Sequence, residues 1–346
     1  RRSGVDLVVG TSERQKIIDL LEELPDSAAE PLTVVKEISE LEVFEDIELD
    51  KLTGRARAYL KVEEGCEQFC SYCIIPYARG PVRSRPLDNA LREAERLIRA
   101  GFKEIILTGI HLGAYGRDLA DGTNLESLLR RLLLLDKSVR WRLSSLEPTE
   151  VTPELIQLMK ENVNFCPHLH LPLQSAHDEI LADMNRPYKT ADYAEVVRAV
   201  RTAVPAVNIT TDIMVGFPGE TEKHFQEYLQ FVEEIGFGRL HVFQYSPRKG
   251  TPAASFPGQV PAREKEERSR RLIELGRQSA RDYAAKFIGQ ELKVLVEKEV
   301  QAGIMEGHSE NYLRVLFPLE SEKRGQIVPV LIMEAGEDFS RGRPCC

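Results

Sequence analysis

Long apolar runs, cysteine and basic charge are all scarce in this sequence. No uninterrupted hydrophobic stretch approaches the roughly 20 residues that a membrane-spanning helix needs. No basic segment followed by an apolar one marks a secretory signal. Six cysteines in 346 residues are too sparse for the disulfide framework of a small secreted domain. The composition therefore predicts a globular protein of more than one domain with no membrane partner.

The shortage of basic charge is a local property. The formal net charge is −9, and residues 37–50 alone hold seven acidic side chains and no Lys or Arg. A basic patch can bind phosphates whatever the total charge of the chain. The acidic balance therefore neither supports nor excludes a nucleic-acid substrate.

Three of the six cysteines stand together in GCEQFCSYC, residues 65–73. Spacings of four and three residues on one short loop can place the thiolates of Cys66, Cys70 and Cys73 on three irons of a single [4Fe–4S] cluster. The fourth iron could then take a substrate or cofactor, whereas electron-transfer clusters usually have every iron capped by cysteine. The spacing therefore indicates a catalytic cluster, and the reduced cysteines that it needs indicate the cytoplasm.

A structural zinc site is the main alternative, and it fits less well. Such sites take four ligands, typically in two pairs, and no fourth cysteine lies near the three. His111 could complete the set only through the fold, and nothing in its spacing suggests that role. Cys166, just before an apolar run, is expected to be a buried packing residue. Cys345 and Cys346 are expected to form an exposed tail.

The flanks of the three cysteines resemble the signature of radical S-adenosylmethionine (SAM) enzymes, with Tyr72 as the aromatic residue before the third cysteine. Residues 60–85, LKVEEGCEQFCSYCIIPYARGPVRSR, look like the methylthiotransferase branch of that superfamily. Within the branch, the chain most resembles the bacterial enzymes that methylthiolate N6-threonylcarbamoyladenosine in tRNA. Three further segments fit the same group: HLHLPLQS (168–175), TDIMVGFPGET (211–221) and RLHVFQYSPRKGTPAA (239–254).

Apolar strands and amphipathic helices alternate from residue 57 to residue 245, which predicts an α/β fold with a parallel sheet and helical crossovers. We expect six strands, at 57–62, 104–109, 141–146, 168–173, 208–216 and 239–245. The helices between them are expected at 86–100, at 125–135, from 152 onward, at 190–203 and at 221–235. The resemblance implies that the sheet is an open, six-stranded partial (β/α) barrel, whereas periodicity alone would not separate that from a doubly wound sheet.

The chain is expected to divide into four segments. Residues 1–30 look like the remnant of an N-terminal α/β domain, and residues 31–55 read as an acidic linker. Residues 56–287 would form the radical SAM barrel with a trailing charged helix at 261–287. Residues 288–346 resemble the TRAM module, a small β-barrel that binds RNA in many tRNA-modifying enzymes. Two readings of the charged helix stay open: a solvated helix packing on the barrel, or an RNA-facing one.

Several polar residues and glycines fall at the carboxyl ends of the expected strands, where parallel α/β architectures collect ligands. The resemblance implies that the following residues bind SAM: Tyr72, Thr108, Gly109, Ser144, Ser145, Glu147, His170, Gln174, Arg186, Gly216, Phe217 and Gly219. For each of them, an ordinary role as a turn residue or helix cap stays open. Arg186 could also bind a substrate phosphate.

The resemblance implies a transferase that uses SAM both as methyl donor and as the source of a 5′-deoxyadenosyl radical. The product would be 2-methylthio-N6-threonylcarbamoyladenosine, formed at C2 of the base at position 37, next to the anticodon. Implied partners are the tRNA anticodon stem-loop, a reductant such as flavodoxin or ferredoxin, and a sulfur donor. Rival substrates are isopentenyladenosine of tRNA and an aspartate of a ribosomal protein. A radical SAM enzyme without sulfur chemistry, and an RNA-binding protein with a structural or redox-sensing cluster, also stay open.

Enzymes of this branch hold a second [4Fe–4S] cluster through three cysteines of an N-terminal domain. This chain has no cysteine before Cys66, and its opening GVDLVVG resembles the end of that domain. We therefore expect the full-length protein to hold a second cluster whose ligands are absent from this chain.

Overall fold

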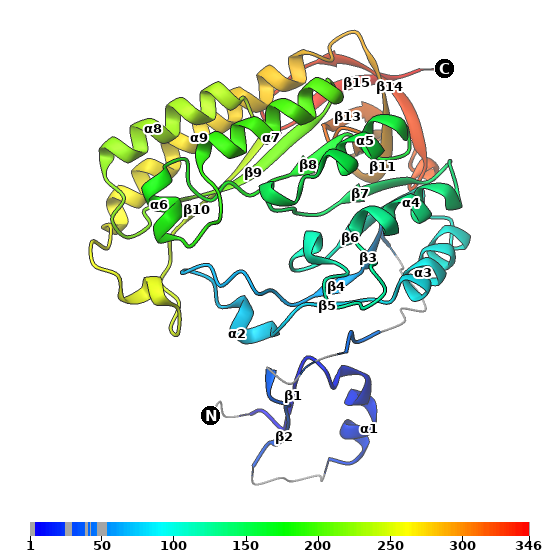
Figure 1. Cartoon of the computed structure of the whole chain (residues 1–346). Coiled ribbons are helices and arrows are strands. Elements are labelled where there is room, and N and C mark those ends of the chain that lie inside the picture. Colours follow the sequence, from blue (N-terminus) through cyan, green and yellow to red (C-terminus); the bar gives the residue numbers. More distant parts are fainter. Residues whose placement is uncertain (1–3, 25–29, 39–40, 42, 47–53, 346) are drawn as a thin grey trace.

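The computed structural model describes residues 4–24, 30–38, 41, 43–46 and 54–345. Figure 1 shows a small N-terminal α/β unit, a curved sheet with helices along its outer side, and a small β-barrel at the C-terminal end. No helix in the described part of the chain is long and apolar enough to cross a membrane.

Six parallel strands form the curved sheet. They are β3 (Ala58–Lys61), β6 (Glu104–Thr108), β7 (Arg140–Leu143), β8 (His168–His170), β9 (Asn208–Val215) and β10 (Arg239–Gln244). Two three-stranded sheets, in the orders β3-β6-β7 and β10-β9-β8, meet between β7 and β8 through isolated parallel bridges. No pairing joins β3 to β10 among the described strands. The predicted open six-stranded partial barrel is therefore confirmed.

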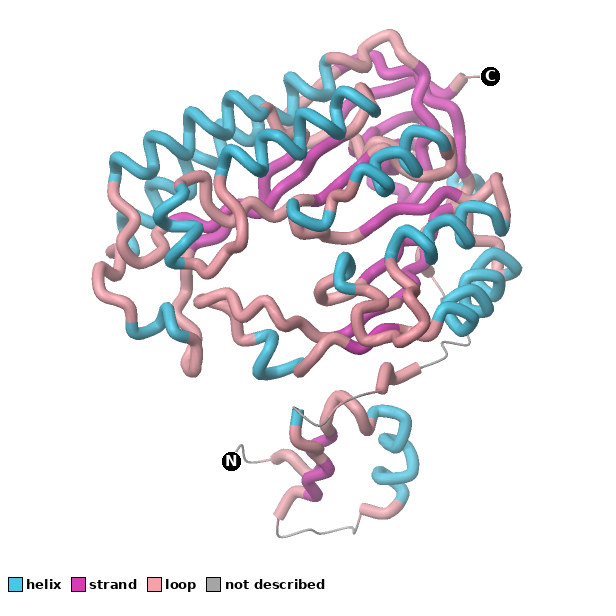
Figure 2. Tube along the Cα trace, viewed as in Figure 1, coloured by secondary structure: helices cyan, strands magenta, loops and turns pink. Residues whose placement is uncertain are grey.

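Helices cover the outer face of this sheet, as Figure 2 shows by the cyan coils outside the magenta strands. They are α3 (Leu87–Arg99), α4 (Leu125–Leu135), α5 (Pro153–Glu161), α7 (Thr190–Ala203) and α8 (Glu222–Ile235). Their starts follow from capping chemistry: the side chains of Asn124, Thr152 and Thr221 each accept a backbone N–H of the first turn. Their apolar faces pack on the strands in one continuous core.

Two strands are shorter than predicted. The expected strands at 141–146 and 168–173 end at Leu143 and His170. Pro172 has no backbone N–H to continue the ladder. The backbone N–H of Leu173 instead donates to the hydroxyl of Thr211, 2.9 Å away. The chain beyond β8 is therefore held to β9 by this side chain as well as by isolated backbone bonds at Leu171 and Gln174.

The C-terminal segment is a closed five-stranded barrel. Its strands are β11 (Glu291–Gln301), β12 (Ile304–Ser309), β13 (Arg314–Pro318), β14 (Ile327–Glu334) and β15 (Ser340–Pro344), in the order β11-β12-β13-β15-β14. The barrel has its own core, which includes Val294, Val315 and Phe317. The small β-barrel that the sequence predicts at this end is confirmed.

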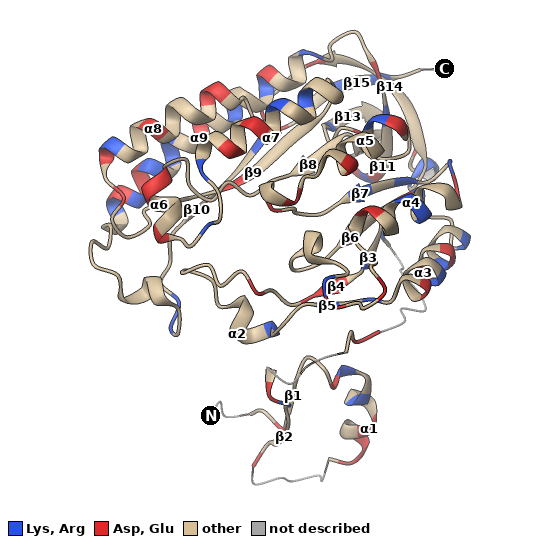
Figure 3. Cartoon of the chain, in the orientation of Figure 1, with Lys and Arg blue, Asp and Glu red and all other residues tan. Residues whose placement is uncertain are grey.

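The charged helix α9 (Ala262–Ala285) joins the two barrels. Leu272 and Tyr283 are buried, and the hydroxyl of Ser279 donates to the carbonyl of Phe237 at 2.6 Å. The helix therefore packs on the partial barrel, which agrees with the first of the two readings. Acidic and basic residues are interspersed along this helix (Figure 3). An RNA-facing role for that side stays a prediction.

A buried ionic cluster fastens the C-terminal barrel to the end of the curved sheet. The carboxylate of Glu104 pairs with Arg57, Arg140 and Arg142. The two arginines of β7 also donate to backbone carbonyls of the C-terminal barrel, at residues 293 and 308–310. The ring of Tyr312 stacks on His168, with centroids 4.5 Å apart. These contacts place the C-terminal barrel against the end of the partial barrel at which β6, β7 and β8 begin, and we call this end the floor.

The N-terminal unit consists of β1 (Leu7–Val9), α1 (Ile17–Glu22) and β2 (Leu32–Val34). β1 and β2 pair in parallel. Residues 32–34 belong to the predicted linker, so the ordered unit extends beyond residue 30 because this apolar, β-branched segment pairs with β1. Residues 39–40, 42 and 47–53 of the predicted linker lie outside the described residues, as do 25–29 and Cys346.

The remaining elements are short. They are β4 (Glu63–Glu64), α2 (Ile75–Arg79), β5 (Arg83–Ser84), α6 (Asp178–Asp183) and 3-10 turns at Arg14–Lys16, Leu112–Ala114, Pro148–Glu150, Pro252–Ser255 and Ser321–Lys323. β4 and α2 flank the loop that carries the three neighbouring cysteines, so they set its position.

Candidate active site

The three-cysteine loop is anchored from both sides. The backbone N–H of Cys66 donates to the carbonyl of Gly80 at 3.0 Å. Ser71 donates through its backbone to Met184 and through its hydroxyl to Asp183. Cys70 is buried, while Cys66 and Cys73 are partly exposed. The loop is therefore tied to the segment before β5 at Cys66 and to the end of α6 at Ser71.

Two basic side chains lie against the sulfurs. Nη1 of Arg186 donates to the Sγ of Cys70 over 3.3 Å, and Nδ1 of His111 lies 3.6 Å from the Sγ of Cys66. Positive groups beside thiols favour the thiolate form, which is the form that binds iron. Hydrogen bonds to cluster sulfurs also tune the reduction potential. The surroundings of the cysteines therefore fit an iron–sulfur cluster.

A single metal ion fits less well. A zinc ion bound at about 2.3 Å by thiolates would bring their sulfurs to within about 4 Å of each other. Among the described residues, two groups of three possible ligand side chains gather within 4.8 Å, and neither group contains a cysteine. The sulfurs of Cys66, Cys70 and Cys73 therefore do not all lie within 4.8 Å of one another, as the ligands of a single zinc ion would. Burial raises the pKa of the Cys73 thiol. A bound iron–sulfur cluster would favour the thiolate form instead.

Arg186 links the cysteine loop to the end of β7. Its guanidinium pairs with Glu147 and donates to the hydroxyl of Tyr188 over 3.0–3.1 Å. That hydroxyl in turn donates to the carbonyls of Pro172 and Leu173. The structure thus brings together the predicted site residues Arg186, Glu147 and Cys70. Sequence reasoning missed Tyr188, although its place two residues after Arg186 in MNRPY was a usable signal.

Glu63 is a second residue that sequence reasoning missed. It is fully buried, and its Oε2 accepts the backbone N–H of His111 at 2.6 Å. Burial raises its pKa to about 7, and Oε1 has no protein partner in the described structure. A Cβ on Gly109 would lie 2.6 Å from Oε2, so only glycine fits there. The paired acids directly before Gly65-Cys66 could have drawn attention to it.

The ends of β6 and β7 carry the predicted Thr108, Ser144 and Ser145. The backbone N–H of Ser144 donates to Leu107 at 2.9 Å, and its hydroxyl is buried without a partner in the described structure. Ser145 is exposed and forms a bridge to His170. The carbonyl of Thr108 accepts from Val62 at 2.9 Å. The unpartnered hydroxyl of Ser144 is the atom of this group best suited to a ligand.

The turn after β9 packs beside the cysteine loop. Gly216 (φ +73°) and Gly219 (φ +84°) both have the left-handed conformation that favours glycine. Phe217 is buried with its ring edge-on to Tyr72, centroids 6.5 Å apart. Burial raises the pKa of Tyr72. The predicted residues Tyr72 and Phe217 therefore meet in space.

His170 and Gln174 lie differently from the rest. The polar partners of His170 in the described structure are Thr210 and Asp212, inside the lumen. Gln174 has φ +64° and bonds through its backbone to β9. The structure thus places no direct contact between either side chain and the cysteine loop, and their predicted role at SAM stays a prediction. Cys166 is buried and Cys345 is partly exposed.

Comparisons with known proteins agree with this site. Residues 60–232 match the family model of the radical SAM superfamily. The chain is 39% identical over 345 residues to the threonylcarbamoyladenosine tRNA methylthiotransferase MtaB of Bacillus subtilis, covering 98% of this chain and 76% of that protein. It is 40% identical over 311 residues to MtaB of Thermotoga maritima, covering 90% and 70%.

A second group of relatives carries another name. The tRNA-2-methylthio-N(6)-dimethylallyladenosine synthase of Moorella thermoacetica is 37% identical over 333 residues, covering 96% of this chain and 74% of that protein. Among solved structures, the radical SAM methyltransferase TsrM from Kitasatospora setae aligns with a TM-score of 0.49 and 18% identity, over 57% of this chain and 36% of that one. With relatives of both names aligned over most of their length, and a superfamily match around the cysteine loop, the protein belongs to the radical SAM tRNA methylthiotransferase family.

Proposed function

We propose that this protein methylthiolates C2 of N6-threonylcarbamoyladenosine at position 37 of tRNA. The single observation that carries the proposal is the 39–40% identity, over most of the chain, to two proteins named for this reaction. The three-cysteine loop and its cationic partners supply the site that the reaction needs.

Cys66, Cys70 and Cys73 would hold a [4Fe–4S] cluster with one iron open to SAM. When bound, that cluster supplies the electron that cleaves SAM and so makes a radical able to attack an unactivated C–H bond. The chain's own residues do the positioning: Arg186 and His111 hold Cys70 and Cys66 in place, and Tyr72 of the loop packs on Phe217.

The remaining predicted site residues would bind SAM around this loop. The unpartnered hydroxyl of Ser144 and the orphan carboxylate oxygen of Glu63 are both buried, and buried polar atoms of this kind call for a partner. Glu147, already paired with Arg186, can accept a further donor because its side chain is 18% exposed. We assign to SAM contact, as backbone or side chain, Thr108, Gly109, Ser145, Gln174, Arg186, Gly216, Phe217 and Gly219. His170 is not in this set, because both nitrogens of its ring are bonded within the protein, to Thr210 and Asp212.

We further propose that the C-terminal barrel, residues 288–346, is a TRAM-like module that binds the tRNA anticodon stem-loop, and that residues 56–287 are the catalytic unit. The base at position 37 is in a single-stranded loop, so it can be splayed into a pocket. A reductant such as flavodoxin or ferredoxin and a sulfur donor complete the reaction. We place the enzyme in the cytoplasm, where the tRNA is.

Nucleoside mass spectrometry tests the function. We expect tRNA from cells lacking the gene to lose 2-methylthio-N6-threonylcarbamoyladenosine and a plasmid copy to restore it. A plasmid copy carrying Cys70→Ala should not restore it, while one carrying Cys166→Ala should. If that nucleoside persists in the deletion strain and the methylthio derivative of dimethylallyladenosine disappears instead, the radical chemistry stands and the proposed substrate is wrong.

A further inference from the structure

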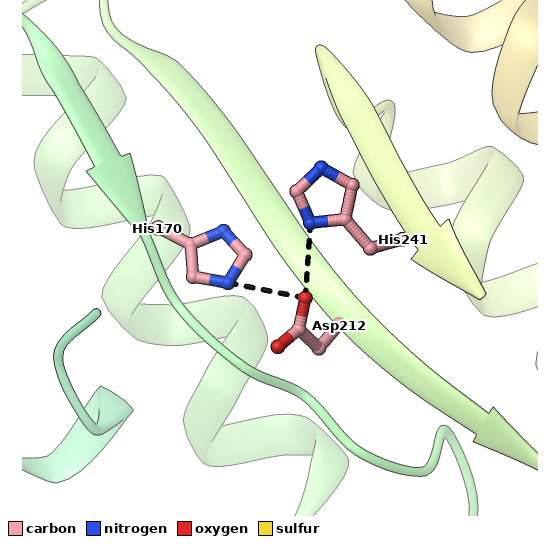
Figure 4. A group of neighbouring side chains, drawn as sticks. All are labelled: His170, Asp212 and His241. Carbon is pink, nitrogen blue, oxygen red and sulfur yellow. Dashed lines mark hydrogen bonds and ion pairs between the residues drawn. The ribbon is translucent and has the colours of Figure 1, made fainter. Parts of the chain in front are cut away.

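Three polar side chains meet in the lumen of the partial barrel, on three neighbouring strands. They are His170 of β8, Asp212 of β9 and His241 of β10, which we call the lumen triad (Figure 4). Oδ1 of Asp212 lies 3.2 Å from Nε2 of His170 and 3.1 Å from Nδ1 of His241. The two imidazole rings are 5.4 Å apart between centroids.

The lumen triad lies between the cysteine loop and the floor of the barrel. Met214 is two residues beyond Asp212 on the same face of β9, and it packs with Tyr72 of the cysteine loop against one apolar cluster. Two residues along a strand span about 7 Å. Below the triad, His168 stacks on Tyr312. A group that enters the lumen beside the cysteine loop therefore reaches the triad before it reaches the floor.

One ring of the triad has a further partner, and two hydrogen-bonding atoms of the triad are left without one in the described structure. The hydroxyl of Thr210 lies 2.9 Å from Nδ1 of His170 and fixes that ring. Within the described part of the chain, Nε2 of His241 and Oδ2 of Asp212 have no protein partner. The side chain of His241 is 44% exposed and that of Asp212 is 26% exposed. One nitrogen and one carboxylate oxygen thus face the lumen.

We propose that the lumen triad binds the polar N6 substituent of the substrate adenosine. This rests on the proposed function. A threonylcarbamoyl group carries ureido N–H groups, a hydroxyl and a carboxylate, whereas a dimethylallyl group carries only hydrocarbon. Oδ2 of Asp212 accepts an N–H or hydroxyl donor, and Nε2 of His241 bonds to the hydroxyl or carboxylate. The triad is thus the determinant that selects the threonylcarbamoyl substrate.

The same geometry disfavours the apolar substituent. A dimethylallyl group beside Asp212 and His241 would displace water from both atoms without replacing its hydrogen bonds. A site built to hydrogen-bond a substrate group discriminates strongly against an analogue that lacks it, because the polar atoms of the site are left unpaired. Overall identity separates the two names by only a few per cent, at 39–40% for the threonylcarbamoyl enzymes against 34–37% for two dimethylallyl synthases, so a specificity residue adds to that distinction.

Binding of modified anticodon stem-loops tests the proposal. Synthetic anticodon stem-loops are titrated into anaerobically reconstituted protein in the presence of SAM. They carry N6-threonylcarbamoyladenosine, dimethylallyladenosine or plain adenosine at position 37. We expect the threonylcarbamoyl stem-loop to bind about 10- to 100-fold more tightly than plain adenosine. His241→Phe and Asp212→Asn should each reduce that ratio to about two-fold or less. The control variant is His224→Ala, on α8, which belongs to the similar group of His177, Glu179 and His224. It should keep the full ratio.

Each outcome has a separate meaning. If wild-type protein prefers the threonylcarbamoyl stem-loop and both triad variants keep the ratio while retaining full iron content, the triad proposal is wrong and the proposed function stands. If wild-type protein prefers the dimethylallyl stem-loop, the proposed function falls as well. Should a variant lose iron or unfold, His241→Asn replaces it, because this smaller polar side chain loses the reach of Nε2. Stoichiometric zinc that survives chelation in wild type but not in the variants would overturn the proposal in favour of a cation site.

Discussion

The guanidinium of Arg186 donates a hydrogen bond to the Sγ of Cys70 over 3.3 Å and pairs at the same time with the carboxylate of Glu147. Its side chain is only 2% exposed. One buried cation thus connects the cysteine loop to the end of β7. A substitution of Arg186 therefore removes a hydrogen bond from the Cys70 thiol and the charge partner of the Glu147 carboxylate.

Arg186→Gln should therefore destabilise the protein. It leaves Glu147 largely buried without its cation, which in other proteins costs about 3–5 kcal/mol. We expect the midpoint of thermal unfolding to fall by several degrees. The double variant Arg186→Gln/Glu147→Gln should recover more than half of the loss, because neither partner then carries an unpaired charge. A single variant that unfolds at the wild-type temperature would show that the pair is not coupled in this way.

The three clustered cysteines and the buried Cys166 should behave in opposite ways. After anaerobic reconstitution, we expect about four irons in the unsubstituted 346-residue chain, as one [4Fe–4S] cluster requires. Cys70→Ala should hold less than about one iron and lose the broad absorbance near 400 nm. Cys166→Ala, which removes a buried thiol far from the loop in sequence, should keep the full iron content. Equal iron content in the two variants would contradict the assignment of the ligands.

Glu104 should make stability depend on pH. Burial alone would raise the pKa of its carboxyl, but the charges of Arg140, Arg142 and Arg57 outweigh burial and lower it well below its usual range. A carboxyl whose pKa is lowered in the folded state stabilises the protein at pH values above its unfolded-state pKa of about 4.3. This stabilisation is lost progressively as the pH falls below that value. Glu104→Gln should lower the unfolding temperature at pH 7, and its gap to wild type should narrow below about pH 4.3. A gap that is constant from pH 7 to pH 3 would argue against this linkage.

Gly216 should tolerate substitution less well than Gly122, although both have φ near +75°. Alanine at either position adds about 1–2 kcal/mol of backbone strain. At Gly216 the new Cβ would also lie 2.3 Å from Cγ of Lys265, whereas at Gly122 nothing lies within 4 Å. We expect Gly216→Ala to lower the unfolding temperature clearly more than Gly122→Ala does. Similar losses would mean that Lys265 moves aside at little cost.

Local signals in the chain were enough for most elements of the fold. Helices at 125–135 and 190–203 have the predicted bounds, because capping side chains and apolar periodicity act within one turn of the chain. The strands at 141–146 and 168–173 were overestimated, since their ends depend on bonds from other segments, such as the hydroxyl of Thr211. The local pattern at Leu32–Val34 predicts a linker instead of the second strand of the N-terminal unit, because the pairing strand is 25 residues away.

The candidate site likewise has some features that the local sequence predicts and others that depend on the tertiary structure. The spacing of Cys66, Cys70 and Cys73 is a property of the sequence alone, because three thiols within eight residues must share one loop. The contacts of Arg186 with Cys70, of Glu63 with His111, and of Asp212 with two histidines join residues from different strands. No short-range pattern encodes such contacts. The kind of chemistry was therefore determined by local sequence, while the groups that tune the thiols and face the substrate were decided only when the curved sheet brought distant strands together.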